Sequence, residues 1–476
     1  MSRTPAGGLI GEGSQPLSLS KYMRSRLARA MASGAYGQII QFGLQLIGVP
    51  LMIAAWGVER YGVWLILMTV PSYLAVADFG FTGAASNEMS MSAVRGDRHE
   101  AVSIYQALRL LLMILAASFM TLLLLALAVF GTALLDFAQV ASNGHAVAIV
   151  LVMAVYGLVA IANGSVNAAF RADDRYATGS TMFQTIFLTE SIAQLATVAV
   201  GGGLLEAALA LCAVRVLGSI AAILLARRQV GWIVAAPGRG TLRELRAMLD
   251  PAMAGLVIPL ANAIMLQGSV LTLSAAAGPA AVPVFSTART LTRFPLQIGQ
   301  IASIASISRF SVAHAASDAM LKARLAFVSF GAMGAVLIPT AIVLLVFGPQ
   351  LTHLWTGGRV EAPWALIATL TLSMFASAAW IVPSNFMIAI NQHRNFAFAF
   401  LALAPVALAV GYVLALRFGP LGTALGAFSL EVAMLLWIYG HRKLPEVMDK
   451  TRMREEFTSL MRHLWGIVSN RGNEAK

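Results

Sequence analysis

The sequence predicts an all-α integral membrane protein with about twelve transmembrane helices in two pseudo-symmetric six-helix bundles. Three observations predict this class: few charges, long apolar runs and an internal repeat. Of the 476 residues, 58% are hydrophobic and 11% are charged, whereas a soluble domain carries about 25% charged residues. Apolar stretches of more than about 18 residues recur along the chain, and each can cross a hydrocarbon layer of ~30 Å.

Apolar segments bounded by charged residues, Gly or Pro define the expected spans. The loops between these segments are short except for one basic, polar stretch near the middle of the chain. The expected spans are 32–56, 61–84, 106–131, 146–169, 176–200, 204–226, 251–276, 282–306, 325–348, 364–390, 396–416 and 420–440.

The distribution of Lys and Arg predicts the orientation of the chain, because cytoplasmic loops carry an excess of basic residues. With both termini in the cytoplasm, only Arg60, Arg359 and Arg417 of the 33 basic residues fall in outer loops. A few arginines lie within spans, and all the others lie in cytoplasmic segments. We therefore expect a multi-pass protein with both termini on the cytoplasmic side.

The basic stretch divides the spans into two groups of six and gives the expected domain organisation. Amphipathic spacing of apolar residues in the two flanking segments indicates helices that lie on the cytoplasmic leaflet. The expected regions are an N-terminal amphipathic segment at 1–31, an N-terminal six-helix bundle at 32–226, a cytoplasmic linker at 227–250, a C-terminal six-helix bundle at 251–440 and a cytoplasmic amphipathic tail at 441–476.

The two halves of the chain resemble each other at nearly one offset. "AAWG" at 54–57 corresponds to "AAAG" at 275–278, and "LAVFGTALLDF" at 127–137 corresponds to "LLVFGPQLTHL" at 344–354. Polar turns join the fourth and fifth spans of each half. Because six spans return the chain to its starting side, the halves have the same orientation. Two such bundles form a V around a central cavity, and rocking them opens the cavity to alternate sides, as in a transporter.

Composition and motifs argue against several other classes. The net charge of +12 comes from short loops at helix ends, which is typical of topology signals and of attraction to anionic lipids rather than of nucleic-acid binding. The single cysteine, Cys212, excludes an intramolecular disulfide. No Walker A pattern and no His/Cys cluster with metal-ligand spacing occurs, and the first 30 residues lack the apolar core of a signal peptide. We therefore expect no bound metal or cofactor and no enzyme.

Three arginines within spans are the candidates for binding an anion. Arg289 and Arg293 lie four residues apart and so share one helix face, and Arg215 lies in the sixth span. Guanidinium groups bind phosphate oxygens in bidentate fashion, so this face favours a phosphate or pyrophosphate. In the alternative interpretation, the arginines extend to the cytoplasmic surface or pair with buried carboxylates.

Three carboxylates also lie within spans: Asp78, Glu190 and Glu431. Ionisable groups at this depth usually face a cavity or a partner. Each is a candidate to bind H⁺ or Na⁺ as a coupling ion, or to be a fixed charge partner of one of the arginines.

The passage "YGVWLILMTVPSYLAVADFGFTGAASNEMSMSAVRGD" beginning at Tyr61 resembles the second span of bacterial polysaccharide transporters. These are the oligosaccharide flippases of the multidrug/oligosaccharidyl-lipid/polysaccharide (MOP) exporter superfamily. Tyr61-Gly62 at the outer end, Asp78-Phe79-Gly80-Phe81 midway and Arg95-Gly96-Asp97 at the inner end carry the resemblance. Twelve spans in two similar halves extend it over the chain and imply a MATE-like fold.

This resemblance implies a flippase in the bacterial inner membrane that moves an undecaprenyl-pyrophosphate-linked oligosaccharide from the cytoplasmic to the periplasmic leaflet. Exopolysaccharide or O-antigen (lipopolysaccharide) synthesis would use such a step. The implied partners are the lipid-linked oligosaccharide, the bilayer, and polysaccharide polymerase or export machinery. The lipid tail stays in the bilayer and is joined to the head group through a lateral gap between the bundles. Arg289, Arg293 and Arg215 neutralise the pyrophosphate.

Two other functions stay open. An ion-coupled multidrug/cation antiporter of the same superfamily would prefer carboxylates in its cavity, whereas two arginines on one face favour an anion. A membrane polysaccharide polymerase or ligase needs a sizeable outer loop with acid and base groups. The outer loops near 132–145 and 349–363 are short and poor in such side chains, which disfavours the polymerase.

Overall fold

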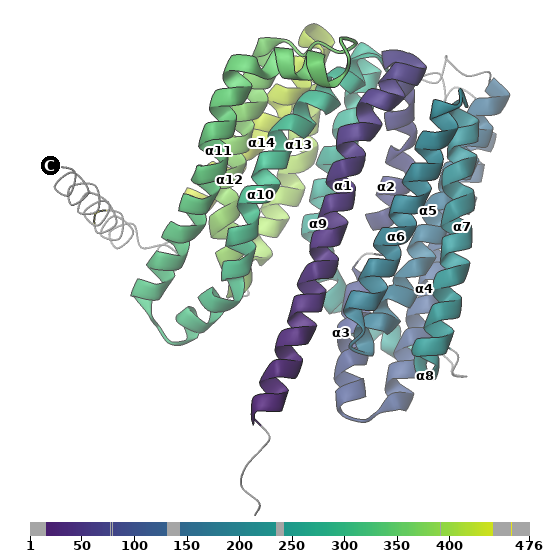
Figure 1. Cartoon of the computed structure of the whole chain (residues 1–476), viewed down its shortest axis with the longest axis vertical. Helices are drawn as coiled ribbons and strands as arrows, with labels where there is room; N and C mark the ends of the chain where they lie inside the picture. Colours follow the sequence, from purple (N-terminus) through teal and green to yellow (C-terminus); the bar gives the residue numbers. More distant parts are fainter. Residues whose placement is uncertain are drawn as a thin grey trace, which may run out of the picture.

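Apolar runs separated by short loops fold here into long helices that lie roughly parallel (Figure 1). The computed structural model describes residues 16–76, 78, 80–130, 143–234, 242–390, 392–440 and 458, and every regular element in this part of the chain is a helix.

The first half forms one bundle. Its elements are α1 (Pro16–Leu67), α2 (Thr69–Val76), α3 (Phe81–Val94), α4 (Arg98–Phe130), α5 (Asn143–Ala172), α6 (Tyr176–Ala199), α7 (Leu204–Gln229) and the short α8 (Gly231–Val234). α1 is two helices joined at Gly57, which has a left-handed φ of 78°. The second span is therefore the end of α1 followed by α2 and α3.

The second half forms the other bundle. Its elements are α9 (Leu242–Ala277), α10 (Ala281–Ala315), α11 (Ala319–Trp355), α12 (Trp364–Ala389), α13 (Arg394–Phe418) and α14 (Pro420–Gly440). Most helices of both bundles extend several residues beyond the expected spans, because they continue past the apolar segment into the predicted cytoplasmic side. The twelfth span, at 420–440, was predicted with the observed bounds.

Nine helical runs in the described ranges are long and apolar enough to cross a membrane. One of them, Ala32–Val94, contains both the first and the second span because it turns at Gly57. α6 and α10 are more polar but run alongside the others (Figure 1). Counting Ala32–Val94 as two spans and adding α6 and α10 gives the predicted arrangement of about twelve spans in two six-helix bundles.

The turn glycines of the internal repeat have the same conformation in both halves. Gly57 ends the first span with a φ of 78°, and Gly278 ends the seventh with a φ of 81°. Glycine adopts this left-handed region without the steric cost of a Cβ. The match between "AAWG" and "AAAG" thus reflects one turn that is used twice.

The two bundles interlock at the predicted outer end, where side chains of each half are buried in the other. Val360, which precedes α12, is 1% exposed in a cluster made mainly of first-half residues. Ile66 of α1 is 2% exposed in a cluster made mainly of second-half residues. The Trp355 indole N–H also donates to the Leu46 carbonyl of α1 at 2.9 Å. Below this contact α10 and α11 diverge from α1, as Figure 1 shows, whereas α9 stays against the first bundle, where Ser103 of α4 donates to the Glu244 carboxylate of α9 at 2.8 Å.

Several predicted regions fall partly or wholly outside the described residues. The tail at 441–476 is described only at Thr458, and no side chain before Arg29 is described. The amphipathic helices expected there stay predictions. Around the linker at 227–250, α7 continues to Gln229, α8 follows, and α9 begins at Leu242. The predicted domain boundaries therefore stay predictions.

Candidate functional site

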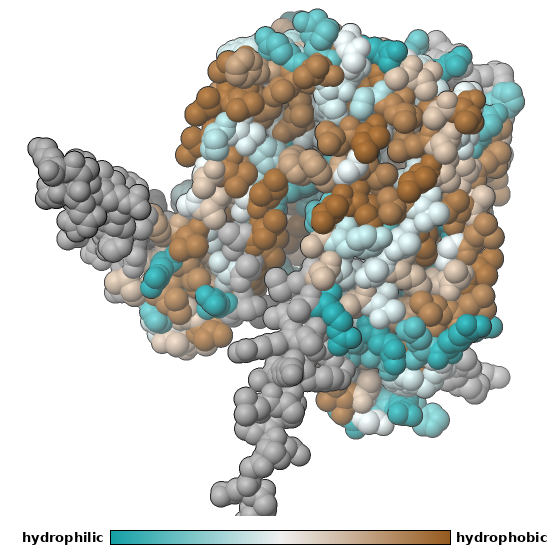
Figure 2. All heavy atoms as spheres, in the orientation of Figure 1, coloured by the Kyte–Doolittle hydropathy of each residue, from teal (hydrophilic) through white to brown (hydrophobic). Residues whose placement is uncertain are grey.

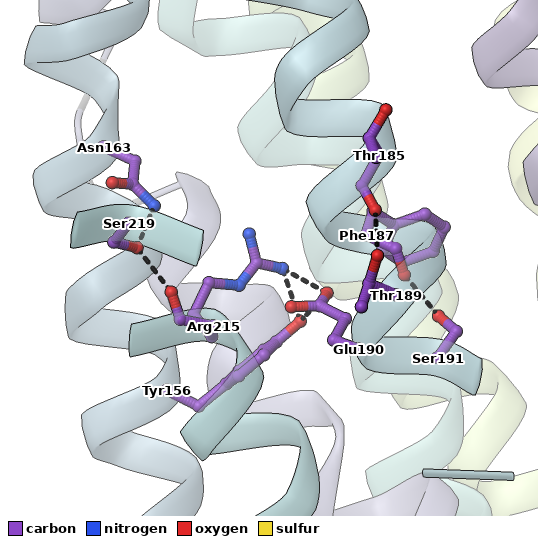
Figure 3. Close-up of polar contacts among 9 residues, drawn as sticks. All are labelled: Tyr156, Asn163, Thr185, Phe187, Thr189, Glu190, Ser191, Arg215 and Ser219. Atoms are coloured by element: carbon purple, nitrogen blue, oxygen red, sulfur yellow. Dashed lines mark hydrogen bonds and ion pairs between the residues drawn. The ribbon is translucent and has the colours of Figure 1, made fainter. Parts of the chain in front are cut away.

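A buried ion pair joins three helices inside the first bundle (Figure 3). The Arg215 guanidinium of α7 donates to the Glu190 carboxylate of α6 at 2.5 Å. The Tyr156 hydroxyl of α5 donates to the same carboxylate oxygen at 2.8 Å and accepts from Arg215 at 2.6 Å. The Glu190 side chain is fully buried and that of Arg215 is 12% exposed. The two charges therefore neutralise each other within the bundle.

Neighbouring groups hold this pair in place. The Arg215 guanidinium lies 4.7 Å from the centroid of the Tyr156 ring. Ser219 donates to the Arg215 carbonyl at 2.6 Å, and Asn163 donates to Ser219 at 2.8 Å (Figure 3). Because the guanidinium of Arg215 is engaged with Glu190, its geometry favours the charge-partner interpretation over pyrophosphate binding. The alternative of pairing with a buried carboxylate was open from the sequence.

A second polar site lies inside the other bundle, in a pocket of about 280 Å³. Arg293 of α10 and Glu431 of α14 both line it. The Trp380 indole N–H of α12 donates to the Glu431 carboxylate at 2.6 Å. The pocket is also lined by Asn262, Gln297, Gln300, Ser377, Ser384 and Asn385. An anionic head group and a small cation would each find polar partners here.

Arg289 lies one turn from Arg293, toward the predicted outer end. Its guanidinium donates to the Leu266 carbonyl of α9 at 3.2 Å and lies 5.0 Å from the centroid of the Phe285 ring. Within the described residues, no carboxylate is at ion-pair distance from Arg289 or Arg293. α10 therefore carries two adjacent cations without a salt bridge, unlike α7.

The carboxylates occupy related places in the two bundles. Glu190 accepts from Tyr156 on the fourth span, and Glu431 accepts from Trp380 on the tenth span, which is its counterpart in the repeat. The last helices differ, because α7 carries the cation Arg215 and α14 carries the anion Glu431. Sequence reasoning missed both aromatic donors, since a Tyr or Trp in an apolar span is usually part of the core.

Asp78 lies where the second span is broken between α2 and α3. Its carboxylate accepts from the Gly80 backbone N–H at 3.0 Å, and its carbonyl accepts from the Phe81 N–H at 2.9 Å. A broken helix frees backbone groups that must be satisfied inside a membrane, and an Asp side chain does so by forming a local turn. The neighbouring Phe79 of the motif lies outside the described residues.

This geometry predicts that the acceptor oxygen of Asp78, rather than its charge, is what the protein needs. Asp78→Asn is expected to keep wild-type transport and melting temperature. Asp78→Ala is expected to lose about 0.5–2 kcal/mol of stability, as other lost caps do. Thermal unfolding in detergent and transport in vesicles measure the two effects. If Asn were as inactive as Ala at unchanged stability, the charge itself would be required and Asp78 would be a coupling residue.

A side opening lies between α1 of one bundle and α10 of the other. It has a volume of about 460 Å³. Figure 2 shows a hollow between the two bundles on the face that presents these helices. Phe42 and Phe294 stack across the opening with ring centroids 4.2 Å apart. Gln297 and Gln300 line both this opening and the Arg293 pocket, so the two spaces adjoin.

The structure thus separates the residues that the sequence grouped together. Arg293 and Glu431 share a pocket, Arg289 lies one turn away, and Arg215 and Glu190 pair in the other bundle. The glutamines of the side opening were also missed. Their spacing along α1, at 38, 41 and 45, is a helix-face signal that was present in the sequence.

No family model matches this sequence, and no curated protein matches it either. Solved structures do match its fold. An inward-facing multidrug resistance MATE family transporter of the MOP superfamily has a TM-score of 0.67 at 14% identity, covering 83% of this chain and 93% of that one. An outward-facing MATE transporter has a TM-score of 0.59 at 15% identity, covering 89% and 96%.

The lipid II flippase MurJ, in an inward closed conformation, is also similar. It has a TM-score of 0.63 at 11% identity, and the match covers 86% of each chain. Likeness at such low identity establishes the architecture alone, because one fold hosts different substrates. This chain is therefore a multi-pass membrane protein with the fold of the MOP-superfamily transporters.

Proposed function

We propose that this protein is a flippase for an amphiphile with an anionic head, namely an undecaprenyl-pyrophosphate-linked oligosaccharide. The observation that carries the proposal is the pair of α10 cations, Arg289 and Arg293, which have no salt bridge within the described residues. Arg293 faces a pocket that adjoins a side opening to the bilayer. A lipid-linked pyrophosphate needs both a cationic site and a lateral passage for its tail.

The closed outer end gives the direction of the proposed cycle. In the structure the bundles interlock at the predicted outer end, and α10 and α11 diverge from α1 toward the predicted cytoplasmic end, while α9 stays against the first bundle. The head group enters from the cytoplasmic leaflet through the α1–α10 opening while the tail stays in lipid. Rocking of the bundles then exposes the head to the periplasm. An inside-negative potential favours outward movement by ~2.3 kcal/mol per negative charge per 100 mV.

In this proposal the chain makes and breaks no covalent bond and needs no cofactor. Glu431 is the residue most suited to an H⁺ or Na⁺ coupling role, because it shares the substrate pocket and has no salt bridge within the described residues. The product, a lipid-linked oligosaccharide in the outer leaflet of the inner membrane, is what a polysaccharide polymerase or export system would consume.

The test is translocation of a fluorescent polyprenyl-pyrophosphate oligosaccharide in vesicles that contain the purified protein. Arg293→Ala is expected to lower the rate at least tenfold, because a hydrogen bond to a charged group contributes about 1.5–3 kcal/mol. Arg293→Lys keeps the charge but loses the bidentate geometry, so its rate should be intermediate.

Arg309→Ala is the matched control, because this exposed arginine is on the same helix and lines neither described pocket. It should translocate the probe at the wild-type rate. Wild-type rates in Arg293→Ala would refute the cationic site, and an immobile probe with the wild-type protein would refute the flippase.

One observation favours the multidrug/cation antiporter as a second candidate. Glu431 and the Trp380 ring lie together in the pocket, and a carboxylate beside an aromatic ring can bind a cationic drug. Uptake of a cationic dye that is driven by a pH or Na⁺ gradient and lost in Glu431→Gln would support that function. The two adjacent arginines on α10 oppose it.

A further inference from the structure

Five glutamines converge on the side opening between the bundles. They are contributed by two helices that belong to opposite halves of the chain, so both halves line the opening. The residues are Gln38, Gln41 and Gln45 of α1 and Gln297 and Gln300 of α10.

Their spacing places them along the length of the opening. Positions i, i+3 and i+7 share one face of a helix, and seven residues of helix rise about 10 Å. The α1 glutamines therefore form a row down the opening, and the α10 glutamines face them from the other bundle. Four of the five are exposed, and Gln300 is half-buried.

The chemistry of this row is polar but uncharged. Each amide offers two donors and an acceptor oxygen with two lone pairs. None of the five makes a hydrogen bond to another described residue of the chain. No Asp, Glu, Lys or Arg lines the opening in the described ranges. Exposed amides without a partner among the described residues suit a ligand that both donates and accepts hydrogen bonds without charge.

Apolar groups border the amides on the same opening. The stacked pair Phe42 and Phe294 lies across it, and its remaining lining residues are isoleucines, Ile39, Ile298, Ile301 and Ile304. A sugar ring presents hydroxyl groups at its edge and C–H groups on its faces, so amides and aromatic rings together match it. A row of amides without the aromatic rings would match water molecules but not the C–H faces of a sugar.

The amide row also leads toward the cationic site. Gln297 lies one helical turn from Arg293, and Gln297 and Gln300 line the pocket that contains Arg293. A head group whose phosphates contact Arg293 would therefore place the sugars nearest the pyrophosphate beside these glutamines.

We propose that the α1–α10 opening is a carbohydrate subsite that binds uncharged sugars, hydroxyl- or acetamido-bearing, next to the pyrophosphate. This inference rests on the proposed flippase function and deepens it. It assigns the first sugars of the glycan to a neutral class, because charged sugars would find no counter-charge in the row.

Two probes separate sugar recognition from pyrophosphate recognition. Both are polyprenyl pyrophosphates that carry a dithionite-quenchable fluorophore on the head group. In one probe a neutral N-acetylhexosamine disaccharide joins the fluorophore to the pyrophosphate, and in the other an uncharged alkyl linker of similar length does so. The readout is the rate at which each probe becomes accessible to dithionite added outside the vesicles.

The test variant is Gln41→Met/Gln297→Met, which removes one amide from each bundle and keeps side-chain length. It is expected to slow the disaccharide probe roughly tenfold, through the loss of several neutral hydrogen bonds, and to leave the alkyl probe within about twofold of wild type. Gln38→Met/Gln300→Met is a second variant of the same row. Gln350→Met, an exposed glutamine of α11 outside both described pockets, should change neither rate.

Each outcome decides between the proposals. Equal slowing of both probes would overturn the sugar subsite and leave an amide-lined passage of general importance. Unchanged rates for both probes would also overturn it while retaining the flippase. If the wild-type protein moves neither probe, the proposed function fails, and the subsite fails with it.

Discussion

Replacing Gly62 with alanine is expected to prevent the outer end from closing and to abolish most translocation. A Cβ at Gly62 of α1 would fall on the backbone carbonyl of Pro279, in the turn before α10, and 3.2 Å from the Pro283 ring. Neither neighbour is a flexible side chain that can move away. Overpacking of this kind costs about 1–3 kcal/mol, which shifts a two-state equilibrium by roughly 5- to 150-fold.

The shift can be measured with one reporter thiol. Ile66 is buried in the outer contact, so a cysteine introduced there, in a Cys212→Ser background, should be protected from a membrane-impermeant maleimide. Gly62→Ala should make this cysteine reactive from outside and lower the translocation rate at least tenfold. The reason is that the alanine variant favours the outward-open state, in which the outer contact is broken.

Gly43→Ala provides the matched control on the same helix. A Cβ at Gly43 meets nothing within 4 Å, so this variant should label and translocate like the parent protein. Equal labelling of the Gly62→Ala and Gly43→Ala proteins, with unchanged transport, would show that the Gly62–Pro279 contact does not hold the outer end closed.

The second large effect is expected at the buried ion pair of the first bundle. Glu190→Gln keeps an acceptor for the Tyr156 hydroxyl but leaves the Arg215 guanidinium without its counter-charge. Removing one partner of a buried pair costs about 3–5 kcal/mol, because an uncompensated charge remains buried. We therefore expect Glu190→Gln to lower the melting temperature of the detergent-solubilised protein strongly.

The double variant Glu190→Gln/Arg215→Met tests the cause. It removes both charges, so most of the lost stability should return, and the non-additivity of the cycle measures the coupling between the two side chains. Arg109→Met, an exposed arginine of α4, should change stability by no more than about 0.5 kcal/mol.

The same double variant also decides what the pair does. If it is stable and transports at the wild-type rate, the pair is a structural link between α6 and α7. If it is stable and inactive, the Glu190 or Arg215 charge serves transport directly. A Glu190→Gln protein that is as stable as the wild type would contradict the argument from burial.

The fold was largely predictable because local sequence determines where membrane spans occur. A span requires a continuous apolar run of fixed length, and its ends are marked by charges, Gly or Pro. α14 illustrates this, because the predicted span at 420–440 has the observed bounds of Pro420–Gly440. The break in the second span was harder to foresee. It depends on how Asp78 and Gly80 satisfy freed backbone groups, which hydropathy does not report.

The candidate site was only partly predictable, because helix pairing depends on rotation and neighbours rather than on composition. The sequence placed Arg215 with Arg289 and Arg293 as one cationic group. In the structure Arg215 meets Glu190 on the preceding helix, and Arg293 shares a pocket with Glu431 far along the chain. A one-dimensional list of charges within spans gives their depth but not the direction in which each side chain points.

By itself, the sequence determined that this is a polytopic membrane protein made of two similar halves, and it predicts that their basic ends lie on one side. These properties follow from apolar length, charge distribution and repetition, all of which can be found along the sequence without knowing which segments meet in space. Only the tertiary structure decided which charges are neutralised, which cations within the described residues have no salt bridge, and which residues line the side opening. Those features arise where side chains from distant segments meet, as the α1 and α10 glutamines do at the side opening.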